Sequence, residues 1–578
     1  MNDIRRSILW VIFGFSLVLL WDRWQIHNGK PATFFPSPAV ATAPAETGPA
    51  RVDNGAASLP SATASGTAAP TAVPSAAAPT AAGTPAQPVA DSTAPGELID
   101  VTTDVYKATF DTRGATLVRL ELLKYVDQDD RTRNVVLFDR HNQHTYVAQT
   151  GLVGAPGLPT HLSMFRFTGT ERALAAGSDA LELRFESANG SGVTLAKTFT
   201  LHRGSYVINV KHDIANATQA AVKPELYMQL MRDGTVKGNT NMLAGPTSFT
   251  GMAFYTDSSK FKKVDFADID KNKATFDKTG NDGWVGMVQH YFASAWLQTT
   301  AGPREFFASR VGDNLYGAGM KLPVGELAPG ASATVTTQLF AGPQEEKRLE
   351  AITPGLELVK DYGIFTIIAK PLYWLLDKLH GVLGNWGWSI VALVFLLKLA
   401  FYWLNAKAYS SMAKMKAINP KIMEMRERLK DKPQQMQQEM MRIYREEKVN
   451  PMGGCFPILV QIPVFIALYW VLLSSVEMRN APWILWIKDL STPDPYFILP
   501  VVMTLSTLLQ TALNPAPPDP MQAKLMWLMP LVFSVMFFFF PAGLVLYWIT
   551  NNLLSIAQQW VINTRMGVPP QFNLPKFK

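Results

Sequence analysis

Apolar and polar residues follow different patterns in different parts of this 578-residue chain. Between about residues 98 and 345 they alternate in short runs separated by clusters of Gly, Asn and Asp. Examples of these runs are Leu181–Phe185, Val193–Leu201, Tyr206–Lys211 and Ala333–Leu339. Alternation with a period of two is typical of β-strands that bury one face. The pattern predicts an all-β domain over 98–345, a sandwich or a related fold, with enough residues for a substantial core.

Long apolar runs dominate the last third of the chain. Five of them have about the length that a membrane-spanning helix needs. They are Trp386–Leu404, Cys455–Val476, Tyr496–Leu513, Leu525–Phe540 and Leu544–Ile562. The preceding segment, 346–385, contains a helical stretch that charged residues interrupt and that Pro371 should break or kink. We expect this segment to lie in the membrane interface rather than to cross the bilayer.

The chain begins with a basic segment that includes Arg5 and Arg6, followed by the apolar run Ile8–Trp21. This order is typical of a secretory signal, but no small-residue cleavage site follows it. We predict an uncleaved signal anchor over 1–27, with a cleaved signal peptide as the alternative. Residues 28–97 are rich in Ala, Pro and Thr and poor in large apolar residues, so we expect a disordered tether.

The distribution of charge predicts an orientation in the membrane. Lys and Arg exceed Asp and Glu by 53 − 46 = 7, and residues 406–454 alone contain 11 basic and 6 acidic residues. Loops rich in Lys and Arg stay in the cytoplasm. With five spans and the N-terminal anchor, six in all, this rule places 406–454, both termini and the tail 567–578 in the cytoplasm. Residues 28–385 are then periplasmic or at the periplasmic face, and the positive charge does not indicate nucleic-acid binding.

Several polar residues lie inside the apolar runs, where they raise the free energy of insertion into the bilayer, and they gather toward one side of the membrane. Lys398, Gln461, Asn551 and Asn552 lie in the central or cytoplasmic parts, whereas the outer ends are apolar, as in Phe537–Phe540. A charged residue within a bilayer has a high free energy of insertion and often has a function. The bias predicts a shared hydrated groove that opens to the cytoplasm and is closed toward the outside. Two alternatives remain: Lys398 reaches the headgroups along its own stem, or each amide forms an ordinary interhelical hydrogen bond.

The basic loop contains two helical stretches on either side of Pro433. Apolar residues recur every three or four positions in both, and many of them are methionines. They are Met412, Met415, Ile418, Ile422, Met425 and Leu429 in the first stretch and Met436, Met440 and Ile443 in the second. The spacing predicts an antiparallel helical hairpin over 406–452. The methionines either pack inside the hairpin or, because they are flexible and polarizable, accept varied apolar segments of a substrate.

The sequence carries no strong signal for enzymatic chemistry. P-loop, HExxH and GxSxG motifs are absent, and the pair His141 and His144 lacks a glutamate at metalloprotease spacing. The single cysteine, Cys455, excludes an internal disulfide and a metal site built from several cysteines. We expect no enzymatic activity, no cofactor and no metal.

Several longer motifs resemble the YidC/Oxa insertase family, with the long matches concentrated in 386–566. They are Tyr409-Ser-Ser-Met-Ala-Lys-Met415, Pro420-Lys-Ile422, Met425-Arg-Glu-Arg-Leu429, Lys448-Val-Asn-Pro-Met-Gly-Gly-Cys-Phe-Pro457, Gln461-Ile-Pro463, Asp494-Pro-Tyr496 and Gly543-Leu-Val-Leu-Tyr-Trp548. The N-terminal anchor, the linker and the β domain resemble the Gram-negative form of the family. The resemblance implies a polytopic α-helical protein of the bacterial inner membrane, with six transmembrane helices, five of them forming the insertase core, and a periplasmic β-supersandwich.

The resemblance also implies a function and its site. A member of this family inserts and chaperones nascent integral membrane proteins in the lipid bilayer, alone or with the Sec translocon, and the ribosome is a further expected partner. Lys398 stands where the family usually has Arg. Lysine keeps the positive charge of arginine but lacks its two-pronged hydrogen-bonding geometry. Gln461 and Trp548 match groove-lining positions, and the hairpin matches one thought to capture substrates. A multi-span transporter is the alternative, and a glycan-binding outer domain would be a second function.

Overall fold

The computed structural model describes residues 96–565 with seven internal gaps, together with residues 567 and 572. The gaps are 129, 142–143, 188–191, 236–248, 430–431, 448–455 and 515–519. The predicted signal anchor over 1–27, almost all of the linker over 28–97 and most of the tail over 567–578 therefore lie outside the described residues. The described chain divides into a unit of β-strands that ends at Lys360 and a helical unit that begins at Asp361.

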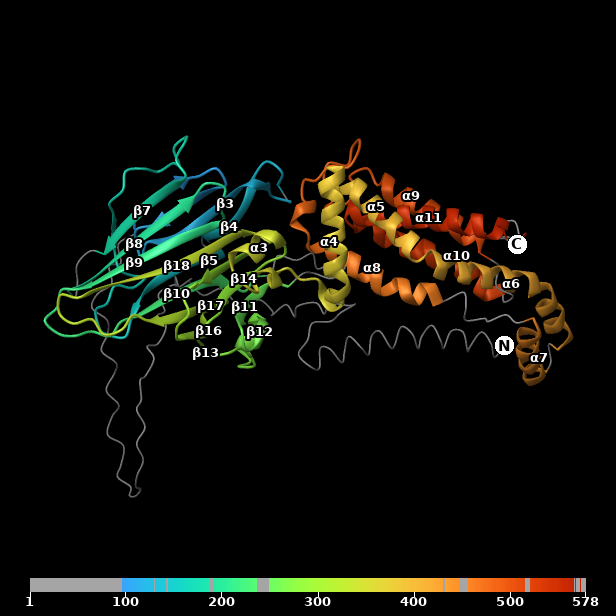
Figure 1. The fold of residues 1–578 in the computed structure, drawn as a ribbon, viewed down its shortest axis with the longest axis horizontal. Coiled ribbons are helices and arrows are strands. Elements are labelled where there is room, and N and C mark those ends of the chain that lie inside the picture. The colour runs from blue at the N-terminus through green and yellow to red at the C-terminus, as the bar shows by residue number, and fades with distance from the viewer. Residues whose placement is uncertain are drawn as a thin grey trace, which may run out of the picture. The chain divides into compact units, whose positions relative to one another are not determined.

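The β unit contains two antiparallel sheets of nine strands each (Figure 1). The first sheet has the strand order β1 (Leu98–Thr102), β2 (Tyr106–Asp111), β3 (Thr116–Val126), β4 (Asn134–His141), β5 (His144–Val153), β10 (Glu225–Asp233), β17 (Leu315–Pro323), β16 (Arg304–Gly312) and β13 (Thr279–Gly280). The second has the order β12 (Lys260–Val264), β11 (Gly251–Thr256), β14 (Trp284–Val288), β15 (Phe292–Leu297), β18 (Ser332–Pro343), β9 (Val207–Asn216), β8 (Val193–His202), β7 (Ala180–Ser187) and β6 (Phe165–Phe167). The predicted all-β domain is confirmed.

The alternating runs form strands because they place apolar side chains on one face. In β7, Leu181, Leu183 and Phe185 are buried while the residues between them are exposed. The ring of Phe185 lies 5.8 Å from that of Phe110, which belongs to the first sheet. Aromatic side chains of both sheets thus share one core, which holds the sheets together through burial of apolar surface.

The core of the β unit also contains a lysine. Lys197 on β8 is fully buried, and its Nζ donates to the backbone oxygens of Gly114 at 2.6 Å and of Thr150 at 2.7 Å. Thr150 lies on β5 of the first sheet, so one side chain connects the two sheets. A buried amine needs such acceptors because an unsatisfied polar group in the interior is strongly destabilising.

Short helices complete the β unit, and the segment 346–385 is divided between the two units. The β unit contains α2 (Phe266–Asp270), α3 (Glu346–Ile352) and the 3₁₀ helix η3 (Leu356–Val359), and the helical unit begins with η4 (Gly363–Phe365) and α4 (Thr366–Leu383). Pro371 lies inside α4 and does not end it. A proline in the second turn removes a single helical hydrogen bond, and buried residues on either side, Ala369 and Leu372, anchor the helix in the core.

The helical unit follows the apolar runs of the sequence. Its further elements are α5 (Trp386–Ala400), α6 (Tyr402–Arg428), α7 (Pro433–Glu446), α8 (Phe456–Ser474), η5 (Val476–Met478), α9 (Ile498–Leu513), α10 (Pro520–Met536), η6 (Phe537–Phe539) and α11 (Ala542–Arg565). Gly384 ends α4 in the left-handed conformation at φ 65°, which glycine adopts without strain. The Asn385 side chain then accepts a hydrogen bond from the backbone N–H of Trp388 at 3.1 Å and caps α5.

One predicted helix is bent. The pattern over 386–404 predicts an uninterrupted helix, but α5 ends at Ala400 and α6 continues at an angle of 67° to it. Within the described residues, no single helix is long and apolar enough to cross a membrane, whereas α5 and α6 as far as Met412 meet this condition together. Three shorter apolar helices are Val460–Ser474, Ile498–Leu513 and Ala523–Phe539.

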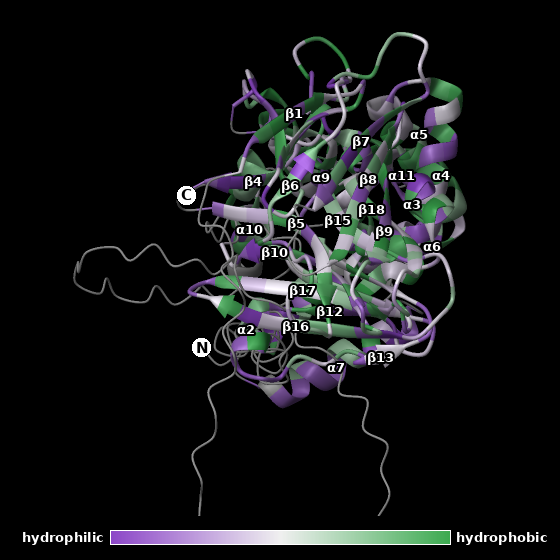
Figure 2. Ribbon diagram, turned by 90° about the vertical axis from the view of Figure 1, so that its left-hand side faces the viewer, coloured by the Kyte–Doolittle hydropathy of each residue, from purple (hydrophilic) through white to green (hydrophobic). Residues whose placement is uncertain are grey.

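The two helices after the bend form the predicted hairpin. Ile418, Ile422 and Met425 are buried between α6 and α7. The residues that pack around them are Met415, Leu429, Met436, Met440, Ile443 and Tyr444. The outer surface of α7 is polar, and Figure 2 shows this helix as mostly hydrophilic. Because the apolar stripe is shared between two helices, each of them depends on the other for its stability.

Candidate functional site

Lys398 lies near the end of α5 that adjoins the bend. Its side chain is only 7% exposed, and its Nζ donates to the Ser555 hydroxyl on α11 at 2.7 Å. The Ser555 hydroxyl in turn donates to the backbone oxygen of Asn551 at 2.7 Å. Within the described ranges, no carboxylate forms an ion pair with Lys398. Among the described residues, the partner that holds this lysine is therefore neutral.

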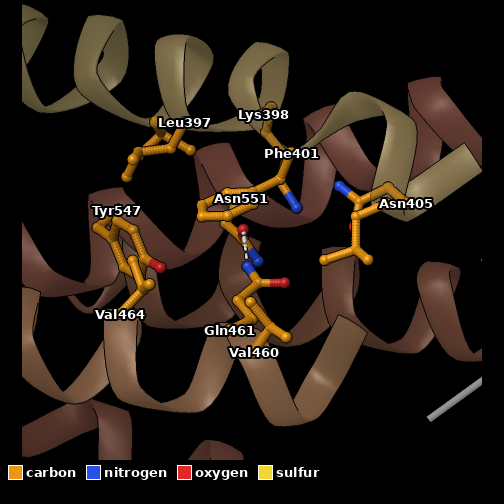
Figure 3. Close-up of a pocket in the computed structure, with 11 residues that line it drawn as sticks. Leu397, Lys398, Phe401, Asn405, Val460, Gln461, Val464, Tyr547 and Asn551 are labelled. Carbon is orange, nitrogen blue, oxygen red and sulfur yellow. Dashed lines mark hydrogen bonds between the residues drawn. The ribbon is translucent and has the colours of Figure 1, made fainter. Parts of the chain in front are cut away.

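Two amides face each other beside this lysine. The Gln461 Nε2 on α8 donates to the Asn551 Oδ1 on α11 at 2.6 Å, and Figure 3 shows the two side chains pointing toward one another. Both residues were predicted as groove residues from their position along the helices. The structure thus brings three predicted residues, Lys398, Gln461 and Asn551, around one cavity.

The cavity is lined by four helices and is small. Its lining residues are Val394, Leu397, Lys398, Phe401, Leu404, Asn405, Val460, Gln461, Val464, Tyr547 and Asn551. The cavity volume is about 30 Å³, which is room for one or two water-sized groups. Of the polar side chains that line the cavity, Gln461 and Asn551 are hydrogen-bonded to each other.

Two further predicted residues lie elsewhere. Asn552 is buried, and its Nδ2 donates to the hydroxyls of Ser506 at 3.0 Å and Thr507 at 2.9 Å on α9. Trp548 packs edge to face against Phe465, with ring centroids 4.7 Å apart. Asn552 thus forms an interhelical hydrogen bond, and Trp548 belongs to the apolar packing; neither of them lines the cavity.

Asn405 and Tyr547 line the cavity without having been predicted there. Residues Asn551, Ser555 and Gln558 follow one another at intervals of four and three, which places them on one face of α11. This spacing was available in the sequence and would have added Ser555 and Gln558 to the predicted groove residues. The position of Asn405 could not be derived in this way, because it lies beyond the bend.

Large apolar side chains pack together at the other end of the helical unit. Phe537 and Phe540 are each 5% exposed, and they share a core cluster with residues of the loop between α8 and α9, including Met478 and Leu490. That loop is tied to the start of α11, since the Gly543 N–H donates to the Leu490 oxygen at 2.9 Å. The polar cavity therefore lies toward the hairpin, and the opposite end is filled with packed side chains.

The predicted capture residues of the hairpin are mainly internal. Met425 is buried in the hairpin core, and Met415, Met436 and Met440 pack around it. Met412 lies on α6 outside that cluster and is half-buried. Among the described residues of the hairpin, the exposed methionines are Met423 and Met441, each 46% exposed.

Comparisons with known proteins match both units. Residues 98–375 match the family model described as YidC periplasmic domain, and residues 378–568 match the one described as 60Kd inner membrane protein. The chain is 54% identical over 567 residues to the membrane protein insertase YidC of Cupriavidus necator, with 98% of each chain covered. It is 52% identical over 569 residues to that of Burkholderia cenocepacia, covering 98% of this chain and 99% of the relative.

A crystal structure described as an active YidC insertase covers 80% of this chain and 93% of its own, with 20% identity and a TM-score of 0.38. The sequence matches to the two relatives cover 98% of the chain. The two family models together cover the β unit and the helical unit that contains the cavity. The chain therefore belongs to the YidC family of inner-membrane protein insertases.

Proposed function

We propose that this chain inserts membrane proteins through the groove around Lys398, which receives the polar flank of a substrate from the cytoplasm. Membrane protein insertion is the function of its family, so the chain is an insertase of the inner membrane with a periplasmic domain and not an enzyme. Its substrates are membrane proteins. The observation that carries the mechanism is the buried amine of Lys398, which has no ion-pair partner among the described residues and lies next to a cavity lined by amides.

The charge of Lys398 supplies attraction for an acidic substrate group. At a separation of 6 Å and an effective dielectric constant of 20, two opposite charges attract by about 3 kcal/mol. The amide pair of Gln461 and Asn551 offers replacement hydrogen bonds once it opens. Together these groups lower the free energy of bringing a polar segment part-way into the bilayer, and transfer of the apolar segment into lipid drives its release.

The packed outer end supports insertion rather than transport. A transporter or channel needs a polar path or a gate to the other side, whereas Phe537, Phe540 and Leu490 fill that end with apolar side chains. The inserting segment then leaves the groove sideways into lipid, along α5, α8 and α11. No nucleotide is required in this mechanism.

The proposed topology has six spans, with both termini and residues 406–454 in the cytoplasm and 28–385 periplasmic or at the periplasmic face. The net charge of 11 − 6 = +5 on 406–454 supports this orientation. We place α4 in the membrane interface because it exposes a row of large apolar side chains: Ile367 is 91%, Trp374 61% and Val382 84% exposed. The Sec translocon and the ribosome are the proposed partners.

The hairpin is the proposed first contact of a substrate. Its core methionines are shared between α6 and α7, so they can reach a substrate only when the two helices separate. The exposed Met423 and Met441 are available without that change, and flexible methionine side chains adapt to apolar segments of different shape. Met423 lies 21 residues beyond Tyr402, about 32 Å along α6, so a substrate captured there moves along α6 to reach the groove.

The test uses purified protein in liposomes. A short single-span substrate with an acidic translocated tail is added, and protection of the tail from protease is compared with that in empty liposomes. A second substrate carries Asn and Gln in place of the acidic residues. We expect Lys398→Met to reduce protection of the acidic tail at least tenfold, as about 3 kcal/mol of lost attraction allows, and to affect the neutral tail much less. Lys398→Arg should retain activity.

Lys407→Met is the matched control for this experiment. Lys407 lies on α6, beyond the bend; its Nζ lies 3.8 Å from the centroid of the Trp403 ring and it does not line the cavity. This variant should insert both tails as the unmodified protein does. Equal protection of the acidic tail by the unmodified protein and Lys398→Met would contradict the proposed role of Lys398.

A further inference from the structure

The bend between α5 and α6 has none of the usual backbone causes. Sharp helix kinks generally occur at proline, at glycine, or where a side chain enters the hydrogen-bond ladder. Residues 397–405 contain neither proline nor glycine. In a continuous helix the Lys398 carbonyl would accept from the backbone N–H of Tyr402, four residues later. At the bend, this carbonyl instead accepts from the Gln558 side chain of α11 at 3.1 Å.

Gln558 also binds the helix on the other side of the bend. Its Oε1 accepts from the Asn405 Nδ2 at 3.2 Å. Asn405 belongs to the first turn of α6 and is 8% exposed. One side chain of α11 therefore holds the last turn of α5 and the first turn of α6 at the same time. The groove lysine is fixed twice by α11, through its backbone by Gln558 and through its amine by Ser555.

We propose that Gln558 is a positioning residue that sets the angle between α5 and α6, and so fixes how the hairpin is presented to the groove. The importance of Gln558 for insertion rests on the proposed function. Its effect on the angle between α5 and α6 is independent of that function. Holding both helices in this way requires a neutral amide, because the side chain must donate one hydrogen bond and accept another. A glutamine donates to the Lys398 carbonyl and accepts from Asn405 simultaneously, whereas an ionised glutamate cannot donate and a leucine can do neither.

Loss of Gln558 leaves the Lys398 carbonyl without its donor inside a membrane, where an unsatisfied backbone group is strongly disfavoured. Straightening of the helix satisfies it again, because the Tyr402 N–H then becomes its donor. Two interhelical hydrogen bonds of the average strength found in membrane proteins change the ratio of bent to straight forms by about eightfold. The hairpin moves with α6 when that ratio changes.

The neighbouring residue provides a matched control. Gln559 is also buried on α11, but its Nε2 donates to the Leu513 oxygen at 3.3 Å and to the Asn514 Oδ1 at 3.5 Å, at the end of α9. Gln559→Leu removes the same kind of side chain from the same helix without touching the bend. Asn405→Leu removes one of the two bonds of Gln558 and leaves α11 unchanged.

The experiment measures the bend directly. Spin labels are attached to cysteines that replace Trp388 on α5 and Lys414 on α6, both exposed, in a full-length chain with Cys455→Ser. These positions lie 13 residues on either side of Phe401. At 1.5 Å rise per residue their backbones are about 32 Å apart with the observed bend and about 39 Å apart in a straight helix.

We expect Gln558→Leu to raise the population at the longer distance about eightfold relative to the shorter one and to reduce protease protection of the inserted tail. Asn405→Leu should give a smaller shift in the same direction, and Gln559→Leu none. Unchanged distances in Gln558→Leu would overturn the inference. So would a shifted distance with full insertion activity, because the angle would then not matter for insertion. Failure of the unmodified protein to insert any substrate would refute the proposed function separately and leave the distance comparison intact.

Discussion

Replacement of Lys197 should change how the stability of the β unit depends on pH. The amine is fully buried and donates to two backbone oxygens, and none of the described carboxylates forms an ion pair with it. Its neighbours in the core are the Phe165 ring, 4.7 Å from Nζ, and His212, its partner in the strand register. Burial lowers the pKa of Lys197 from 10.5 to about 7.

The sign and size of the effect follow from proton binding. Between pH 7 and 10.5 the unfolded chain holds a proton on Lys197 that the folded chain has lost, so the free energy of unfolding rises with pH. With these two pKa values the rise is about 2 kcal/mol from pH 7 to 9. From pH 5 to 7 it is below about 0.5 kcal/mol, because both states are then largely protonated. Lys197→Met removes this dependence while keeping a stem of similar length.

The assay is urea denaturation of residues 96–360 at pH 7, 8 and 9, followed by the fluorescence of Trp284 and Trp296, which are both 1% exposed. The difference in unfolding free energy between unmodified protein and Lys197→Met should shift by about 2 kcal/mol across this range in favour of the unmodified protein. The range ends at pH 9 because tyrosines of the unfolded chain ionise near pH 10. A difference that stays constant within about 0.5 kcal/mol would refute the reasoning.

Two further predictions concern a second titratable residue in the core of the β unit, His212, and the hairpin. Burial lowers the pKa of His212 to about 3; the unfolded histidine binds a proton below about pH 6.5, so stability should fall from pH 6.5 to 3. His212→Leu should remove that part of the loss in urea titrations at pH 4 and 6.5, and an equal loss in both proteins would contradict it. Ile422→Ala should destabilise the hairpin by roughly 2–4 kcal/mol and speed amide hydrogen exchange in α6 and α7, whereas Met423→Ala, at a 46% exposed position, should have little effect. Equal exchange in these two variants would show that the buried stripe does not hold the hairpin together.

The fold was largely predictable where one periodicity dominates. Strands β7, β8, β9 and β18 form where alternating residues predicted them, because a strand with one buried face shows its period directly in the sequence. The apolar stripe of the hairpin was predictable for the same reason. Pairings between strands far apart in the sequence, such as β10 with β17 and β18 with β9, were not predictable, because local periodicity does not report on distant partners.

The groove was predicted in part. Position along the helices grouped Lys398, Gln461 and Asn551, which line one cavity, but it could not tell which way each side chain faces. Asn551 and Asn552 are consecutive, so they project about 100° apart around α11. One therefore faces α8 and the other faces α9. The same limit applies to Trp548, whose packing partner Phe465 could not be identified from spacing alone.

The bend at Phe401 could not be predicted from local sequence. Its hydrogen-bonding partner, Gln558, is 160 residues away from Lys398 along the chain, and nothing in 397–405 marks a kink. The local pattern of hydrophobic residues predicts one straight helix for this segment. Side chains supplied by a distant helix are thus the part of the site that only the structure reveals.

The central claim is that an inserting segment passes through the groove on its way into lipid. A photoreactive amino acid is placed either at Leu397 or Val464, which line the cavity, or at Leu505 on α9, which is 61% exposed and lies outside it. A membrane protein segment arrested during insertion should crosslink to Leu397 and Val464 through its polar flank and not to Leu505. Insertion without crosslinks to either cavity position, or with equal crosslinks to Leu505, would contradict the claim.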